Sequence, residues 1–134
     1  MTSVSKSELR RLWSALGIPA DYAAVRDLPI QREAMRLVSL GRAADDGRVV
    51  RVTPRTAAAF RRMRAAATRD DVTLLPLSGF RSVRRQTQNI RRKLAAGHAI
   101  ADILRLVAAP GCSEHHTGRA LDLGSPDDVG LDEK

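Results

Sequence analysis

Two segments of the sequence contain residue types that could bind a carboxylate and a metal ion. The first is Ser78-Gly-Phe-Arg-Ser-Val-Arg-Arg-Gln86, whose Arg81 follows the apolar run Val72–Ser78, a predicted central strand. Binding groups often emerge from strand ends, and an arginine there can hold a carboxylate through paired hydrogen bonds. Taken alone, however, this segment favours a simpler interpretation in which Arg81 is one more exposed arginine.

The second segment is Pro110–Asp122, in which His115 lies in a glycine-bearing loop and Asp122 lies on the predicted strand at 119–123. An imidazole and a carboxylate are both good ligands for zinc. To bring these two side chains together the loop must fold back, and Gly118 permits that turn. The alternative is a surface histidine pair with a turn-anchoring aspartate, which the isolated His–Asp spacing favours.

Hydrophobic spacing and cap residues predict an α+β fold, a small sheet with helices packed on it. The helix after Thr53-Pro54 is expected to bury Ala57, Phe60, Met63 and Ala67. Helices are expected at residues 7–16, 31–40, 54–68, 82–97 and 99–108, and strands at 49–52, 72–78 and 119–123.

The composition excludes several classes of protein. A single cysteine, Cys112, excludes an internal disulfide, and no apolar run reaches the ~20 residues of a membrane span. The first residues lack the apolar core of a signal peptide, so the chain as written is expected to be cytoplasmic.

The net charge of +8 suggests a polyanionic partner, but an arginine-rich and alanine-rich composition explains it more simply. A basic nucleic-acid-binding protein is the least favoured alternative. The predicted helix that contains Arg84, Arg85, Arg91, Arg92 and Lys93 suggests it, but a nucleic-acid partner is not expected, because the aromatic platforms that bind single strands are missing.

Together the two segments resemble the VanY-type D-alanyl-D-alanine carboxypeptidases. These zinc peptidases cut cell-wall peptides and share a superfamily with D-Ala-D-Ala dipeptidases and the hedgehog signalling domain. Residue types, order and spacing agree over Ser78–Leu123, and residues 53–78 agree more weakly. The resemblance implies a small, mainly antiparallel sheet. It also implies an N-terminal helical extension at 1–50, a peptidase core at 51–123 and a loose tail at 124–134.

The resemblance assigns a role to each candidate residue. His115 and Asp122 would be two of three zinc ligands, and Arg81 would hold the peptide carbonyl oxygen as it becomes an oxyanion. Ser113 and Gln86 would hydrogen-bond the substrate near its D-Ala terminus, and a zinc-bound water would attack the peptide bond. The expected partner is a peptidoglycan stem peptide or another peptide of the D-Ala-D-Ala type. His116 is expected to point away from His115 in extended backbone, as a supporting or surface residue.

One part of the family pattern is missing. The third ligand and the general base come from a C-terminal Glu-x-x-Trp-His type motif, yet residues 123–134 contain neither histidine nor tryptophan. Truncation of a longer enzyme is the favoured explanation, and an unfinished sheet edge would then allow self-association. A non-catalytic cell-wall peptide-binding relative is the second explanation. The third is a substitute ligand such as His98 or Glu133. The family often acts in the cell envelope or periplasm, in tension with the missing export signal.

Overall fold

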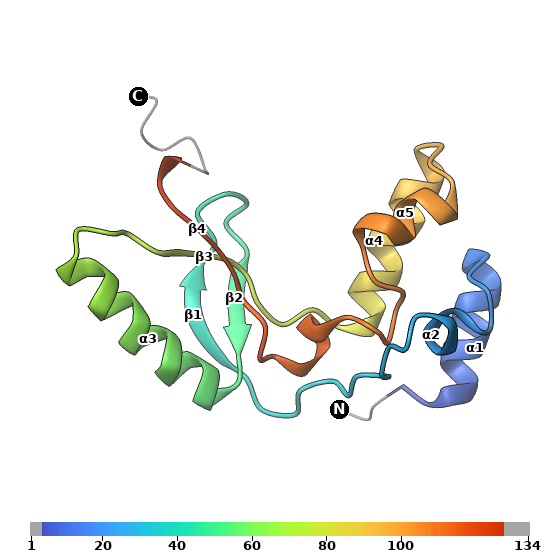
Figure 1. Cartoon of the computed structure of the whole chain (residues 1–134), viewed down its shortest axis with the longest axis horizontal. Coiled ribbons are helices and arrows are strands. Elements are labelled where there is room, and N and C mark those ends of the chain that lie inside the picture. The colour runs from blue at the N-terminus through green and yellow to red at the C-terminus, as the bar shows by residue number, and fades with distance from the viewer. Residues whose placement is uncertain (1–3, 128–134) are drawn as a thin grey trace. The chain divides into compact units, whose positions relative to one another are not determined.

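The computed structural model describes residues 4–127 and has the α+β fold that the sequence predicts. The helices and strands follow the order shown in Figure 1. They are α1 (Lys6–Leu16), α2 (Tyr22–Val25), β1 (Val38–Arg42), β2 (Val49–Val52), α3 (Pro54–Arg69), β3 (Leu75–Ser78), α4 (Val83–Ala95), α5 (Ile100–Leu106), the 3₁₀ helix η1 (Glu114–Thr117) and β4 (Asp122–Gly124).

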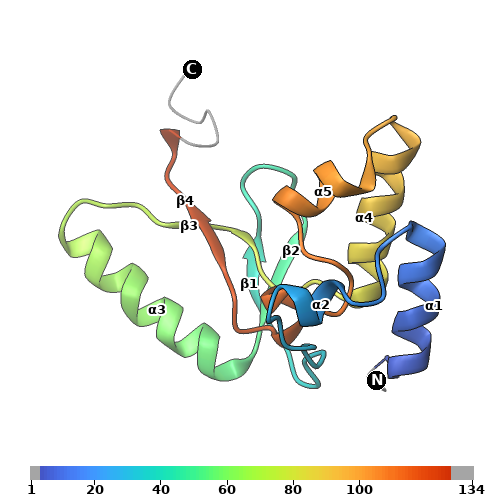
Figure 2. The ribbon, with the colours of Figure 1, turned by 45° about the vertical axis from the view of Figure 1, so that its right-hand side comes forward.

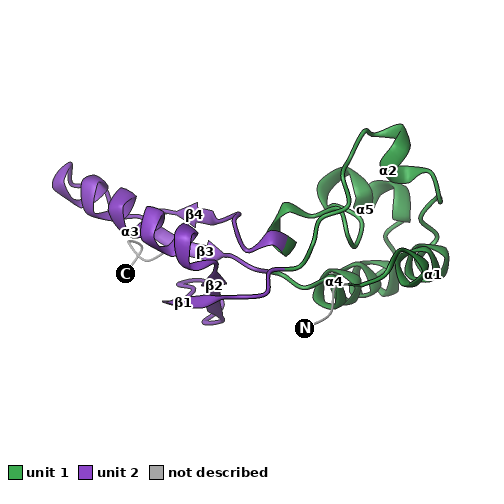
Figure 3. Cartoon of the chain, turned by 90° about the horizontal axis from the view of Figure 1, so that it is seen from below, with its two compact units in different colours: residues 1–33, 81–116 green, residues 34–80, 117–134 purple. Residues whose placement is uncertain are grey.

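The chain forms two compact units, coloured separately in Figure 3. Among the described residues, unit 1 contains 4–33 and 81–116, and unit 2 contains 34–80 and 117–127. The chain therefore passes between the units three times. The predicted domain boundaries at residues 50 and 123 stay a prediction, and residues 128–134 of the predicted tail lie outside the described part.

Unit 1 is a helical unit whose core lies among α1, α2, α4 and α5. Ser5 caps α1 by accepting a hydrogen bond from the Glu8 amide (3.2 Å), and α1 ends at Gly17 with φ of 78°. Figure 2 shows α1 and α4 side by side. The indole of Trp13 donates to the Pro110 carbonyl (2.8 Å), which ties α1 to the loop before η1. The core consists of Trp13, Leu16, Ile18, Tyr22, Ile90, Ile103, Ala109 and Cys112.

Helix α4 has the cap and the buried face that its sequence predicts. The Ser82 hydroxyl accepts a hydrogen bond from the Arg85 amide (3.0 Å). Val83, Thr87 and Ile90 are buried, because they recur at the spacing of one helical face. The opposite faces of α4 are consequently left to polar and charged side chains.

Unit 2 contains two antiparallel strand pairs and α3. In the first pair Val38 is opposite Val52, and in the second Leu75 is opposite Gly124. The antiparallel pairing confirms the predicted sheet type. Self-association through a sheet edge stays a prediction.

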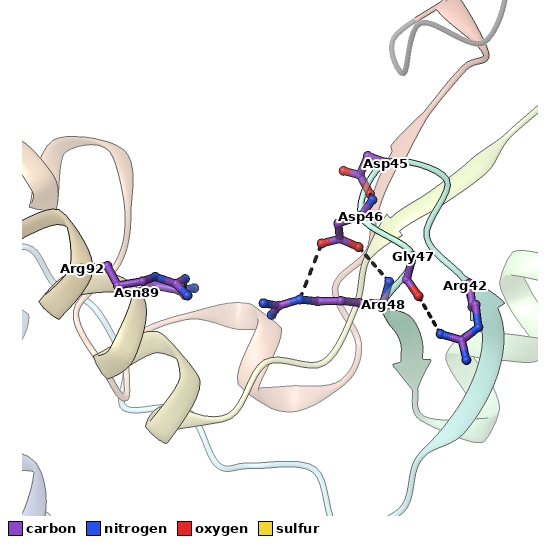
Figure 4. Close-up of polar contacts among 7 residues, drawn as sticks. All are labelled: Arg42, Asp45, Asp46, Gly47, Arg48, Asn89 and Arg92. Carbon is purple, nitrogen blue, oxygen red and sulfur yellow. Dashed lines mark hydrogen bonds and ion pairs between the residues drawn. The ribbon is translucent and has the colours of Figure 1, made fainter. Parts of the chain in front are cut away.

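The turn between β1 and β2 is built from short-range polar contacts (Figure 4). Arg42 donates from Nη1 to the Gly47 carbonyl (2.9 Å), and the Arg48 amide donates to Asp46 Oδ1 (2.9 Å). Arg48 and Asp46 also form an ion pair at 3.8 Å, but both side chains are about half exposed. Such exposed pairs contribute at most about 1 kcal/mol, so the hydrogen bonds determine the turn.

The structure confirms the predicted helix at 54–68 as α3, but it does not confirm that the whole inner face is buried. Thr53 caps it by accepting from the Thr56 amide (3.3 Å), and Ala57 and Phe60 are buried as predicted. Met63 is 47% exposed, so its predicted burial is wrong. The reason is length: α3 has 16 residues and lies against β1, which has five, so the strand covers only part of the helix.

The predicted helix at 31–40 is wrong, because this segment leads into β1. The Gln31 amide donates to the Gly111 carbonyl (2.7 Å), and Val38 then pairs with Val52. Tertiary hydrogen bonds thus override a local helical spacing. No helix among residues 4–127 is long and apolar enough to cross a membrane.

Candidate active site

The backbone of Arg81 is held from both sides by the loop that contains η1. The Arg81 amide donates to the His115 carbonyl (3.0 Å), and the Arg81 carbonyl lies 2.6 Å from Nδ1 of His116. Both bonds lie within unit 1. The two segments that the sequence singles out, separated by about thirty residues, are therefore joined where Arg81 begins its side chain.

His116 holds the two segments together through hydrogen bonds of its side chain. Its side chain is fully buried, and Nε2 accepts a hydrogen bond from the Gly111 amide (3.0 Å). Because Nε2 accepts, the ring is neutral and Nδ1 donates to the Arg81 carbonyl. Burial lowers the pKa of His116 and outweighs the opposing effect of the Arg81 carbonyl. The expected extended backbone is wrong, since residues 114–117 form a 3₁₀ turn that directs this ring into the interior.

The side chains of Arg81 and Gln86 are also in contact. Arg81 donates from Nη1 to Oε1 of Gln86 (3.2 Å), and Gln86 donates from Nε2 to the Ala108 carbonyl (2.7 Å). Gln86 is 2% exposed, so its amide is fixed between these two partners. Gln86 thereby orients the guanidinium of Arg81.

Ser113 and His115 belong to the same hydrogen-bonded loop. The Ser113 hydroxyl accepts from the His115 amide (3.2 Å), and the Ser113 carbonyl accepts from the His116 amide (3.1 Å). Ser113 is buried and His115 is half-buried. Unit 1 thus brings together four of the five predicted site residues, namely Arg81, Gln86, Ser113 and His115.

Asp122, the fifth predicted residue, lies in unit 2. It is exposed at the start of β4 and is opposite Ser78, the last residue of β3. Leu123 is half-buried beside it. The strand begins three residues later than the predicted 119–123, and Ala120 and Leu121, which were predicted to face opposite sides, are both half-buried. Because His115 and Asp122 belong to different units, their pairing as ligands stays a prediction.

Two glycines of the sequence motifs occupy places where a side chain does not fit. A Cβ on Gly79 would lie 2.4 Å from the Arg51 carbonyl oxygen of β2. Gly118 has φ of +68°, and a Cβ there would lie 2.9 Å from Leu37. Its carbonyl accepts from the Thr53 amide (2.9 Å), which ties the loop before β4 to the cap of α3. Glycine is therefore required for close packing at Gly79 and for both conformation and packing at Gly118.

An open groove of about 440 Å³ lies within unit 1 beside Arg81 and Gln86. Sequence reasoning assigned these two residues to the substrate and named His98 as a substitute metal ligand, but it did not indicate that these residues and the others share a groove. The i, i+3 spacing of Gln86, Asn89 and Arg92 is the signal that could have predicted a shared helix face. The remaining lining residues are Asn89, Arg92, Lys93, Ala96, His98 and Val107.

The residues present fit a zinc ion in type but not in number. His115 supplies an imidazole and Asp122 a carboxylate, the donors that zinc accepts. Within residues 4–127, no group of three or more His, Cys, Asp or Glu side chains could hold a metal ion. Of the two substitute ligands considered, His98 lies in the groove beside α4, and Glu133 lies outside the described residues.

Comparison with known proteins gives a consistent result. The family model VanY, D-alanyl-D-alanine carboxypeptidase, matches residues 49–134, more than half of the chain. No curated protein matches.

Three solved structures are similar to the chain. The LD-carboxypeptidase LdcB, whose structure is described as revealing the molecular basis of peptidoglycan recognition, is 27% identical. It matches over 75% of this chain and 48% of its own, with a TM-score of 0.63. A variant of the vancomycin-resistance D,D-pentapeptidase VanY in complex with Zn(II) is 25% identical over 76% of this chain and 58% of its own, with a TM-score of 0.55. VanYB in complex with D-Ala-D-Ala is 26% identical over 75% and 56%, with a TM-score of 0.56. The chain therefore spans about half the length of these proteins.

Proposed function

Since the chain belongs to the VanY family of D-alanyl-D-alanine carboxypeptidases, we propose that it forms the substrate-binding part of a zinc-dependent peptidase. Its substrate would be a peptidoglycan peptide ending in D-Ala-D-Ala, and the reaction is hydrolysis of the terminal peptide bond. The similarity to a D-Ala-D-Ala complex and to a Zn(II) complex supports this proposal. With such a substrate, the activity would be at the cell envelope.

The hydrogen-bonded junction between Arg81 and the 113–116 loop is the observation that carries the proposal. Arg81 has a fixed backbone, a guanidinium oriented by Gln86 and a place beside an open groove. A cation held in this way stabilises the negative charge that develops on a carbonyl oxygen during hydrolysis, because it is oriented before the reaction begins. Gln86 and Ser113 would align the D-Ala terminus of the peptide.

His115 and Asp122 would hold the zinc ion. When bound, zinc lowers the pKa of a coordinated water to about 7 and polarises a carbonyl oxygen. The chain's own residues supply orientation: the Ser113 hydroxyl holds the His115 amide, and the His115 carbonyl holds Arg81. The proposed metal ligand His115 and the proposed oxyanion-stabilising Arg81 are therefore joined directly by a backbone hydrogen bond.

A third ligand and a general base are needed to complete the site. Residues 123–134 contain no histidine, and residues 4–127 contain no cluster of three donors. The second candidate function is therefore a binding module that keeps the groove, Arg81, Gln86 and Ser113 but does not catalyse. The observation that favours it is this incomplete donor set beside a well-ordered arginine.

Release of D-Ala from a peptide ending in D-Ala-D-Ala separates the two candidates. The peptidase proposal predicts zinc-dependent release that falls about 100-fold or more in Arg81→Gln, the typical loss for an oxyanion-stabilising group. Arg91→Gln is the matched control, because Arg91 is exposed on α4 and lies outside the groove. Peptide binding without zinc-dependent release would instead identify a binding module.

A further inference from the structure

We propose that the groove beside α4 binds a carboxylate of the substrate peptide upstream of the scissile bond, so that this chain selects acidic peptides. The inference rests on the proposed function, since it takes Arg81 and Gln86 to hold the reacting end of the peptide. It adds a second contact that determines which peptides bind.

The groove beside α4 is lined by positively charged side chains. Arg81, Arg92 and Lys93 line it, and no carboxylate does. Three other grooves of unit 1 each include an acidic side chain: Glu33, Glu8 and Asp102 respectively. A groove lined by cationic side chains attracts anions and disfavours cations, because the electrostatic potential of the lining residues adds up inside a concave surface.

The spacing of Gln86 and Lys93 along α4 indicates how many peptide residues would lie between them. Gln86 and Lys93 are seven residues apart, which is about 10 Å along a helix. An extended peptide advances about 3.3 Å per residue, so a peptide with its reacting carbonyl at Arg81 and Gln86 reaches Lys93 about three residues earlier. The groove therefore matches a peptide with an acidic group about three residues before the reacting carbonyl.

Asn89 orients Arg92, one of the cations that line the groove. Arg92 donates from Nη2 to Oδ1 of Asn89, and both side chains lie on α4 (Figure 4). Asn89 lines the groove together with Arg92. A guanidinium fixed at one edge keeps its other donors for a carboxylate, which it can bind in a bidentate manner.

Cations near the end of a helix also stabilise the helix dipole, so a control for that effect is needed. Arg91 supplies it, since it is next to Arg92 on α4 but lines a different groove with Glu8 and Arg84. Replacing Arg91, which directly precedes the last turn of α4, removes one positive charge from this end of the helix, as replacing Arg92 does. Only Arg92 and Lys93 change the proposed peptide contact.

The experiment measures binding of fluorescently labelled peptides to the full chain by anisotropy, with and without zinc. All peptides end in D-Ala-D-Ala, and each pair differs only by Glu or Gln at two, three or four residues before the reacting carbonyl. We expect the Glu peptide to bind about fivefold more tightly at the matching position, as for one effective ion pair. The preference should disappear in the Arg92→Gln, Lys93→Gln double variant, persist in Arg91→Gln, and weaken with added salt.

Each outcome decides between the inference and the proposed function. Equal binding of the Glu and Gln peptides overturns the inference and leaves the peptidase proposal standing. Arg91→Gln removes one charge and the double variant two, so a preference that Arg91→Gln reduces by about half as much as the double variant, or more, also overturns the inference, because net charge would then be the cause. A groove-dependent preference without zinc-dependent D-Ala release supports the inference and contradicts the peptidase proposal. Failure of all peptides to bind overturns both.

Discussion

His116 offers the most direct test of how the site is held together, through the substitution His116→Leu. The imidazole is fully buried and contacts the Gly111 amide at 3.0 Å and the Arg81 carbonyl at 2.6 Å. Leucine fills a similar volume but forms neither hydrogen bond. The variant therefore isolates the polar role of the ring from its packing.

The magnitude follows from the two backbone groups that lose their partner. A buried donor or acceptor left unsatisfied costs about 1–3 kcal/mol, so the loss of both partners in His116→Leu should lower the free energy of unfolding by about 2–6 kcal/mol. A small domain has about 5–15 kcal/mol in total, so this loss is large. His116→Gln should lose less than about 2 kcal/mol, because an amide has both a donor and an acceptor.

Urea unfolding at pH 8, followed by circular dichroism, measures these differences. His98→Leu is the control, because His98 is exposed and its change should stay within about 0.5 kcal/mol. Loss of less than about 1 kcal/mol in His116→Leu, or equal losses in the Leu and Gln variants, would refute this reasoning. Peptide binding by His116→Gln should remain near that of the unchanged chain, since Arg81 keeps its backbone contact.

Three further predictions concern packing around the motifs. Gly79→Ala should lower the free energy of unfolding by about 2 kcal/mol or more, because the added Cβ would lie 2.4 Å from the Arg51 carbonyl oxygen; urea unfolding checks it. Gly118→Ala should cost about 1–3 kcal/mol by the same measurement, since it combines φ of +68° with a contact of 2.9 Å to Leu37. Burial raises the pKa of the Cys112 thiol, so at pH 8 it should react with a thiol reagent at least about tenfold more slowly than in the unfolded chain. An equal rate in both states would contradict the burial of Cys112.

Local signals predicted where α1, α3 and α4 begin. Ser5, Thr53 and Ser82 each cap the helix that the sequence indicates, and the buried face of α4 follows directly from its spacing. These features depend on interactions within a few residues. A single sequence therefore contains the information needed to predict them.

Features that depend on distant residues could not be predicted in the same way. Residues 31–40 are not helical, because Gln31 is hydrogen-bonded to Gly111 and Val38 pairs with Val52. Spacing alone gave no indication that His116 would be buried. Its position depends on the Arg81 carbonyl, which lies 35 residues away in the chain.

The residues of the candidate site were predicted, but the hydrogen bonds that connect them were not. The motif resemblance indicated Arg81, Gln86, Ser113 and His115, and unit 1 brings these four together. It did not indicate that Gln86 would orient Arg81, because that contact depends on how α4 begins. The ligand roles of His115 and Asp122 remain to be measured.

Zinc binding by this chain, measured by calorimetry, tests the central claim most directly. The account predicts one zinc site whose affinity falls at least about tenfold in both His115→Ala and Asp122→Ala, because each removes a ligand. His98→Ala should leave the affinity unchanged. Zinc affinity that is the same in His115→Ala and Asp122→Ala as in the unchanged chain would contradict the assignment of these two residues as ligands.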